Sequence, residues 1–204
     1  TPALPSLVPL MAFAASLGFE IQKVSPLEIH TESGEYEPAD SQKNPFWRSV
    51  RLNLVKEGRA VTADYICLDL SDDFLRSHGP EQAWIRNMGR NPVLLKAASH
   101  LLPKPYFSIC REAIVSGTPL LVQDETGLEY PDLQRMGTVK LYGRFTGVLH
   151  LFNQESQSKL AEAYGKAGQT SPLPFAFSYQ KSADKRSLQV VRRNPETAAP
   201  VSPQ

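Results

Sequence analysis

The sequence predicts an α+β fold with a mainly antiparallel sheet and a cluster of short helices in a single domain. Segments with the two-residue alternation of strands come in runs joined by short turns, whereas the helix-compatible segments are grouped in the middle of the chain. A doubly wound parallel sheet would instead alternate strands and helices throughout. The chain has neither a GxGxxG motif nor a P-loop motif, so a nucleotide-binding Rossmann or P-loop domain is not expected.

Composition describes a folded domain without a nucleic-acid partner. The 204 residues are enough to bury well over half of the surface of the unfolded chain, and 41% of them are hydrophobic. The 22 basic and 21 acidic side chains leave a net charge of only +1, with no basic run to follow a phosphate backbone. Cys67 and Cys110 lack the close Cys/His pairs of a zinc site, so buried free thiols are expected, with one disulfide as the alternative.

Residues 1–18 are predicted to form an apolar N-terminal segment. No charge occurs from Thr1 to Phe19, Pro9 suits the first turn of a helix, and Gly18 can end it, so the pattern predicts a helix over residues 9–17. The segment lacks the basic flank of a signal peptide, and its prolines make it a poor spanning helix. A start rich in proline and alanine is typical of a mature end after signal removal. It favours an extracytoplasmic location, periplasmic or secreted, over a cytoplasmic one.

The body of the domain is predicted over residues 19–193. Residues 19–30 read as a strand interrupted at Pro26, and residues 31–44 as a polar loop. The clearest strand pair is an antiparallel hairpin over residues 47–70 with its turn at Glu57-Gly58. The proline-containing tail, residues 194–204, is predicted to be disordered.

Three helices in series are predicted for the middle of the chain. They cover residues 81–89, 92–102 and 106–117, and they end at Gly89, Pro103 and Gly117. The later part of the chain is predicted to contain strands at residues 118–130, 138–147, 173–179 and 187–191, and a polar helix at residues 155–168.

The catalytic candidates lie on the second of these helices. Lys96, Ser99 and His100 are spaced three and four residues apart and would share one face, on which a lysine or histidine could activate the serine. The opposite face would hold Val93, Leu94, Ala97 and Leu101. Ser99 has no recognisable oxyanion hole or nucleophile elbow, so a half-solvated polar helix face is the favoured interpretation.

Other polar residues suggest binding more than catalysis. Asp124 is a fourth catalytic candidate, although the first position of a type I turn explains it better. Lys140, Tyr142 and Arg144 share one face of a predicted strand and could bind an anion or an aromatic ligand, with a solvated strand face as the alternative. The histidines show no metal-ligand spacing, so neither a metal site nor a cofactor is predicted.

Several segments together resemble one family of proteins. They are "LLKAASHLL", "LLVQDETGLEYPDL", "VKLYGRFTG", "LPFAFSYQ" and "SLQVVRR". They look like the C-terminal part of a family of uncharacterised, apparently exported bacterial proteins, over residues 10–193. The family members carry an additional aromatic-rich segment ahead of this region, which this chain lacks. The resemblance implies a fold and export, and it brings no activity or catalytic assignment.

These observations favour a non-catalytic accessory or binding subunit. We expect it to be exported and to dock onto a larger assembly, which could be membrane-associated, through residues 1–18 and the C-terminal tail. The partner is expected to be a protein or multi-subunit assembly, with contact between residues 1–18 and a membrane surface as a further option. The alternative is a hydrolase or a small-ligand-binding protein with a site that the sequence does not reveal.

Overall fold

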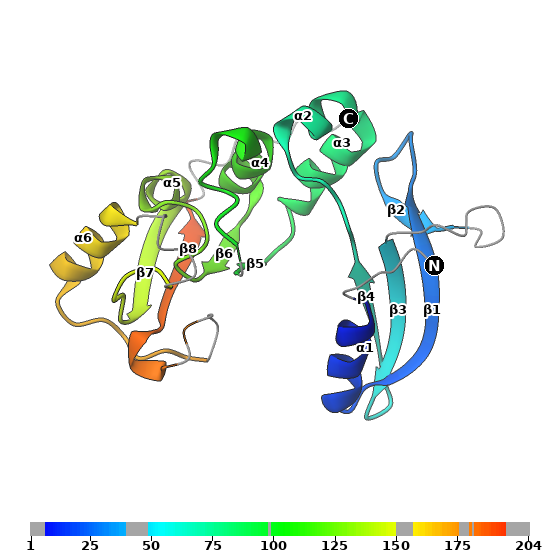
Figure 1. Ribbon diagram of the computed structural model, residues 1–204, viewed down its shortest axis with the longest axis horizontal. Helices are drawn as coiled ribbons and strands as arrows, with labels where there is room; N and C mark the ends of the chain where they lie inside the picture. The colour runs from blue at the N-terminus through cyan, green and yellow to red at the C-terminus, as the bar shows by residue number, and fades with distance from the viewer. Residues whose placement is uncertain are drawn as a thin grey trace. The chain divides into compact units, whose positions relative to one another are not determined.

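The structure is a computed structural model that describes residues 7–39, 49–97, 99–149, 157–175, 180 and 182–194. The predicted α+β class is confirmed: the described residues contain two four-stranded sheets together with short helices (Figure 1). The chain divides into two compact units. The N-terminal unit comprises residues 1–69 and 78–81, and the C-terminal unit comprises residues 70–77 and 82–204.

In the residues that the structure describes, the N-terminal unit is built from an antiparallel sheet and a helix that packs on it. Its elements are α1 (Leu7–Ser16), β1 (Glu20–Ile29), β2 (Tyr36–Pro38), β3 (Ser49–Lys56) and β4 (Arg59–Tyr65), with strand order β2-β1-β3-β4. The predicted hairpin is confirmed, and both residues of its Glu57-Gly58 turn have positive φ, as a type I′ turn requires. However, β4 ends at Tyr65, opposite Val50, so the alternation expected to continue to residue 70 does not form a strand.

The predicted N-terminal helix is confirmed as α1. Gly18 has φ +83 and ends the helix, with its own N–H bonded to the Ala15 carbonyl and the Phe19 N–H bonded to the Ala14 carbonyl. This pair of bonds is the Schellman motif. The inner face of α1 packs on the core of the sheet. That core consists of Val50, Leu52 and Leu54, and its partly buried neighbours include Leu7, Leu10 and Met11.

Pro26 does not interrupt β1, contrary to the prediction. The Pro26 carbonyl accepts a hydrogen bond from the Ala39 N–H (2.9 Å), so this carbonyl points toward β2 and away from β3. The nitrogen and carbonyl of one strand residue point to the same side, and β2 pairs with β1 only from Leu27 onward. The missing N–H therefore removes no hydrogen bond between β1 and β3, and the strand continues through the proline.

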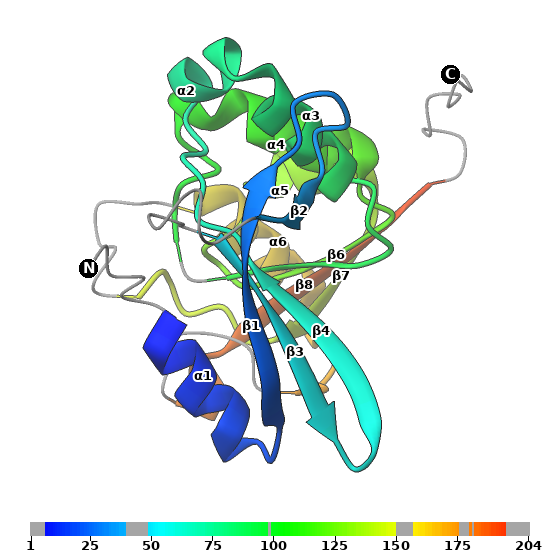
Figure 2. The ribbon, with the colours of Figure 1, turned by 90° about the vertical axis from the view of Figure 1, so that its right-hand side faces the viewer.

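The C-terminal unit is built around a mixed sheet. Its strands are β5 (Leu94–Lys96), β6 (Leu120–Gln123), β7 (Gly137–Gly143) and β8 (Ser187–Arg193), in the order β5-β6-β8-β7 (Figure 1). Its helices are α2 (Asp72–Ser77), most of α3 (Gly79–Met88), α4 (Ser108–Gly117), α5 (Tyr130–Met136) and α6 (Ser158–Ala167), with 3-10 turns η1 (Pro105–Phe107) and η3 (Ala183–Lys185). In this sheet β5 and β6 are parallel, whereas β8 runs antiparallel to both β6 and β7. Figure 2 shows β6, β7 and β8 from a second side.

The helix predicted over residues 92–102 is wrong. Leu94–Lys96 form β5, which pairs with β6 and places Leu94 beside Leu121. A short apolar run suits a helix and a buried strand equally well, and the hydrogen bonds to β6 decide between them. Two residues expected to face a core are largely exposed instead, Val93 at 48% and Leu101 at 40%.

The strand predicted over residues 187–191 is confirmed as β8, which lies between β6 and β7. Residues 173–175 are not in a strand, while residues 176–179 and the tail from 195 to 204 lie outside the described residues.

Side chains from distant elements cap both ends of α4. At its N-terminus, the buried Asp72 of α2 accepts hydrogen bonds from the Ser108 hydroxyl (2.5 Å) and the Ile109 N–H (2.9 Å). At its C-terminus, the Arg193 guanidinium donates to the carbonyls of Val115 and Thr118. Both contacts satisfy backbone groups that a helix leaves unpaired, and they tie α4 to α2 and β8.

Candidate functional site

The catalytic candidates lie at the end of an edge strand and in the loop after it. Lys96 is the last residue of β5, Ser99 follows in the loop, and His100 is buried. The loop returns Ser99 to Lys96, whose Nζ donates to the Ser99 Oγ at 3.3 Å. The structure therefore brings two of the candidates together, but by a loop and not by a shared helix face.

The Lys96 ammonium group is occupied by this loop. It also donates to the carbonyl oxygens of Ser99 (2.8 Å) and Ala97 (3.3 Å). Burial lowers the pKa of Lys96, and the negative charge of Asp124 acts in the opposite direction. A lysine that activates a serine must be a neutral amine, so that it can accept the hydroxyl proton. Here the Lys96 ammonium group donates hydrogen bonds to three acceptors in the loop. The geometry thus supports a structural role for Lys96 better than a Ser–Lys dyad.

Asp124 is the first residue of a tight turn, as predicted. The Gly127 N–H donates to the Asp124 carbonyl (3.2 Å), and the Asp124 Oδ1 accepts from the N–H (2.9 Å) and hydroxyl (2.5 Å) of Thr126. The sequence did not show that this turn is fully buried: Asp124, Glu125 and Thr126 are each at most 1% exposed. Among the described residues, the buried Asp124 Oδ2 has no hydrogen-bond partner.

A buried polar network surrounds the turn, and the sequence analysis missed it. The Gln123 side-chain amide forms hydrogen bonds with both the N–H and the carbonyl of Leu128. Its Nε2 also donates to the Oε1 of Gln189 on β8 at 3.4 Å. Gln189 in turn contacts the hydroxyl groups of Tyr164 and Ser187. A signal was present in the sequence, because Gln123 and Gln189 occupy the same strand faces as the apolar Leu121 and Val191.

Glu125 is the ionisable group of this network. Its Oε2 accepts from the Ser187 hydroxyl at 3.2 Å, while its buried Oε1 has no hydrogen-bond partner in the described part of the chain. Burial raises the pKa of Glu125 above its ordinary 4.5, and the Asp124 carboxylate adds to this shift. Hydrogen bonds, including those from Ser187 and Gln180, partly oppose it. The fold therefore favours the protonated form of this carboxyl group.

Glu125 should make the stability of the protein depend on pH. Because its pKa is raised on folding, the stabilisation is complete below 4.5 and is lost as the pH rises through the folded-state value. A Glu125→Gln variant does not titrate, so its free energy of unfolding relative to the wild type should rise with pH, by up to about 1.4 kcal/mol per pH unit in that window. Urea unfolding of both proteins between about pH 4 and about pH 8 measures this slope. Parallel stability curves would show that Glu125 does not change its protonation on folding.

The three ligand-binding candidates line two adjoining pockets. The first, here called the α6 pocket, has a volume of about 710 Å³ and lies between residues 143–147 and the C-terminal half of α6. The second, the β7 pocket, has a volume of about 510 Å³ and lies between residues 139–142 and the same helix. Arg144 lines the α6 pocket, whereas Lys140 and Tyr142 line the β7 pocket. Gln169 and Thr170 line both.

The strand ends between the two pockets. Gly143 is the last residue of β7 and has φ +69, so Arg144 lies beyond the strand and does not continue the face of Lys140 and Tyr142. The predicted single strand face is therefore two separate surfaces. Both are open to solvent and both are formed against α6, a helix whose contact with β7 could not be seen in the sequence.

No metal centre is found in the part of the chain that the structure describes. No group of three or more His, Cys, Asp or Glu side chains there could hold a metal ion. His30 and His78 are exposed, and His150 lies outside the described residues. Both cysteines are free; Cys110 is buried as expected, whereas Cys67 is exposed.

Comparisons of the chain with protein-family models, with curated proteins and with solved structures find no match. Among the described helices, none has both the length and the apolar composition needed to cross a membrane.

Proposed function

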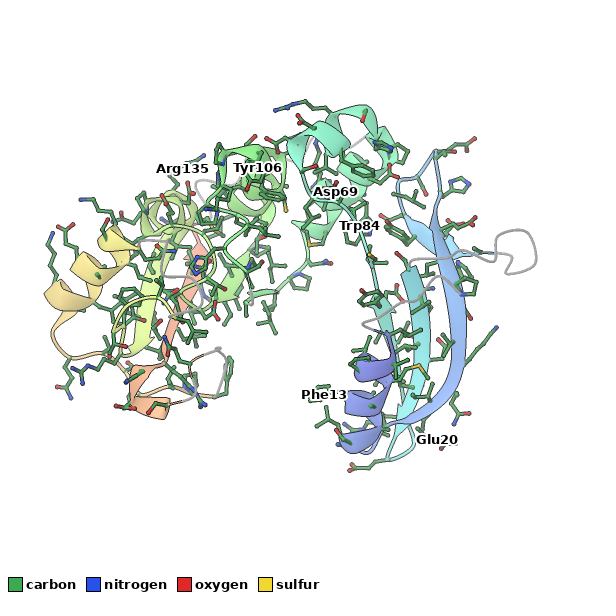
Figure 3. All side chains as sticks on the ribbon, viewed as in Figure 1. Phe13, Glu20, Asp69, Trp84, Tyr106 and Arg135 are labelled. Atoms are coloured by element: carbon green, nitrogen blue, oxygen red, sulfur yellow. The ribbon has the colours of Figure 1, made fainter. Side chains whose placement is uncertain are left out.

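We propose that the protein is an exported, non-catalytic binding subunit that docks onto a larger protein assembly through the outer face of α1. This face consists of Val8, Pro9, Ala12, Phe13, Ala15 and Ser16, all of which are exposed. The observation that carries the proposal is the exposure of large apolar side chains: Val8 is 72% exposed and Phe13 is 62% exposed. Figure 3 shows the Phe13 side chain on the side of α1 that faces away from its sheet.

The composition of α1 supports a protein partner over a membrane surface. A surface helix of a folded protein normally has an apolar inner face and a charged outer face. The inner face of α1 contacts the sheet through Leu7, Leu10 and Met11, but the outer face carries no charge. Helices that lie on membranes are rich in lysine and arginine, which α1 lacks. A helix that is apolar all round is typical of one covered by protein.

The surroundings of α1 extend this apolar surface. Leu17, just after the helix, is 47% exposed, and Val61 on β4 is 43% exposed. Val61 lies directly opposite Leu54, whose side chain belongs to the core that α1 covers. The exposed apolar side chains are therefore not confined to α1, as expected of an interface rather than of a single stray side chain.

Replacing Phe13 by serine should weaken docking without affecting the fold. The side chain is exposed, so its loss removes little packing inside the chain, but it removes the largest apolar contact available to a partner. We expect an unchanged thermal midpoint and at least about a tenfold loss of retained partner. The measurement is co-purification of the full-length wild type and variant from the native source, read by quantitative mass spectrometry.

Leu10→Ser is the matched control, because Leu10 lies on the same helix but packs on the core. It should lower the thermal midpoint, whereas Phe13→Ser should not. A Phe13→Ser variant that melts early would mean that the side chain is already buried inside the chain. Equal recovery of the same partners by the wild type and Phe13→Ser, or binding of the wild type to lipid vesicles alone, would count against a protein-docking face.

A small-ligand function is the second candidate, and it is favoured by one observation. The α6 pocket is formed entirely within the C-terminal unit, and its volume falls within the range of small-molecule sites, about 300–1,000 Å³. This function does not depend on α1, so one protein can carry both.

A further inference from the structure

The α6 pocket contains a glycine that the fold itself does not need. Gly165 lies inside α6, where glycine is markedly less favourable than alanine. Its φ is not in the left-handed region, so the backbone conformation does not demand glycine. A Cβ built at Gly165 would meet no heavy atom within 4 Å. Neither backbone geometry nor internal packing explains this residue.

Gly165 faces the space that the pocket occupies. It lines the α6 pocket together with Gly147 and Gly168, where an added Cβ would also meet nothing within 4 Å. Those two glycines have positive φ and are needed for the backbone, but Gly165 is not. A side chain at Gly165 would extend into this space, so glycine at this position leaves the pocket open.

One wall of the α6 pocket is aromatic and fixed. The rings of Phe145 and Tyr164 lie 5.9 Å apart at an angle of 32°. The Tyr164 hydroxyl is held in the interior, 2.9 Å from the Tyr142 carbonyl and 3.1 Å from the Leu188 carbonyl. Tyr164 is only 8% exposed, so little of its ring reaches the pocket, and the half-buried Phe145 supplies most of the aromatic surface there. A wall of this kind suits the flat, apolar face of a ring.

The polar groups of the α6 pocket are largely uncharged. They include the side chains of Thr146, Gln169 and Thr170, and Arg144 is the one charged residue among those that line it. The lining thus offers a cation no carboxylate, and the single solvent-exposed guanidinium of Arg144 attracts an anion only weakly.

We propose that the α6 pocket binds a neutral saccharide. A sugar ring has an apolar C–H face that can pack on Phe145, and hydroxyl groups that both donate and accept hydrogen bonds. These match the amide of Gln169, the hydroxyl of Thr146 and the guanidinium of Arg144. A purely apolar ligand would leave those polar groups unpaired. This proposal rests on the second candidate function, the small-ligand site in the α6 pocket, and it is independent of the docking face on α1.

Variants of Gly165 in the full-length chain test this site. The probe is a printed array of neutral and acidic oligosaccharides, and titration calorimetry follows with the neutral sugar that binds best. Gly165→Ala should raise the thermal midpoint, because alanine favours the helix, and should weaken binding by about tenfold, as one added methyl group does in a filled pocket. Gly165→Leu and Phe145→Ala should abolish binding.

Ser158→Leu is the matched control: it adds the same side chain at an exposed position of α6 that does not line the pocket, and it should bind as the wild type does. The proposal is overturned if no neutral saccharide binds the wild type, if binding is confined to acidic sugars, or if Gly165→Leu binds normally. A lower midpoint for Gly165→Ala would show that the space at Gly165 is already filled by the chain, which also contradicts the proposal.

Discussion

Replacing Leu52 by alanine should lower the free energy of unfolding by about 2–5 kcal/mol. Leu52 is 1% exposed and lies on β3, which pairs with β1 on one side and with β4 on the other. Its side chain belongs to the core cluster on which α1 packs. Truncation removes buried apolar surface and leaves a cavity between sheet and helix, and a small sheet covered by one helix has little else to fill it.

The measurement is urea unfolding of the full chain followed by circular dichroism. Val61→Ala is the matched control, because Val61 is 43% exposed on the adjacent strand and its truncation should change the free energy of unfolding by no more than about 0.5 kcal/mol. Equal losses for the two variants would contradict the assignment of this sheet face as a core. If instead Leu52→Ala unfolds only part of the signal at lower urea, the two compact units unfold separately.

Replacing Gln123 by alanine should cost about 2–6 kcal/mol, because two buried backbone groups would be left unpaired at about 1–3 kcal/mol each. Gln123 is fully buried at the end of β6. Its Nε2 donates to the Leu128 carbonyl and its Oε1 accepts from the Leu128 N–H, both at 2.9 Å. The side chain thereby closes the turn over residues 124–127 in both directions. Solvent water does not reach these groups to replace the hydrogen bonds, because Gln123 and Leu128 are both at most 1% exposed.

Two further variants test whether the loss of stability comes from these hydrogen bonds or from a difference in secondary-structure propensity between glutamine and alanine. Gln134→Ala changes an exposed glutamine on α5 and should be nearly silent. Ionised Gln123→Glu keeps the acceptor for the Leu128 N–H but has no donor for the Leu128 carbonyl, so this variant should be destabilised at neutral pH and should recover as the pH falls and the carboxyl group gains a proton. Thermal and urea unfolding of all three variants provide the comparison. A Gln123→Ala variant as stable as the wild type would show that the turn is not held by this amide.

Local patterns predicted part of the fold correctly. Val50, Leu52 and Leu54 alternate with polar residues, and the Glu57-Gly58 turn that follows made the hairpin recognisable. The Pro9 and Gly18 signals placed α1 within a few residues. Other usable signals were passed over: α5 begins with Pro131 in its first turn and carries Asp132 near its start and Arg135 near its end, as helices commonly do.

The candidate site was predicted less well, for a different reason. Lys140, Tyr142 and Arg144 do line pockets, but α6, which forms the opposite wall, is separated from them in sequence. Lys96 and Ser99 do meet, yet in a loop where the ammonium serves the backbone. The polar side chains of these residues predicted that each could make a hydrogen bond or ion pair. They did not indicate what the partner of each polar group would be.

The sequence by itself determined the elements whose information is local: the hairpin, α1, α4, α6 and the α+β class. Periodicity and turn residues act within a few positions, so they can be read without knowing the rest of the chain. The tertiary structure alone decided that Leu94–Lys96 form a strand beside β6, that β8 lies between β6 and β7, and that the polar turn at Asp124–Gly127 is buried. The physical reason is that these outcomes depend on hydrogen bonds between residues far apart in the chain. Leu94 meets Leu121, and Gln123 meets Gln189, only after the sheet has formed.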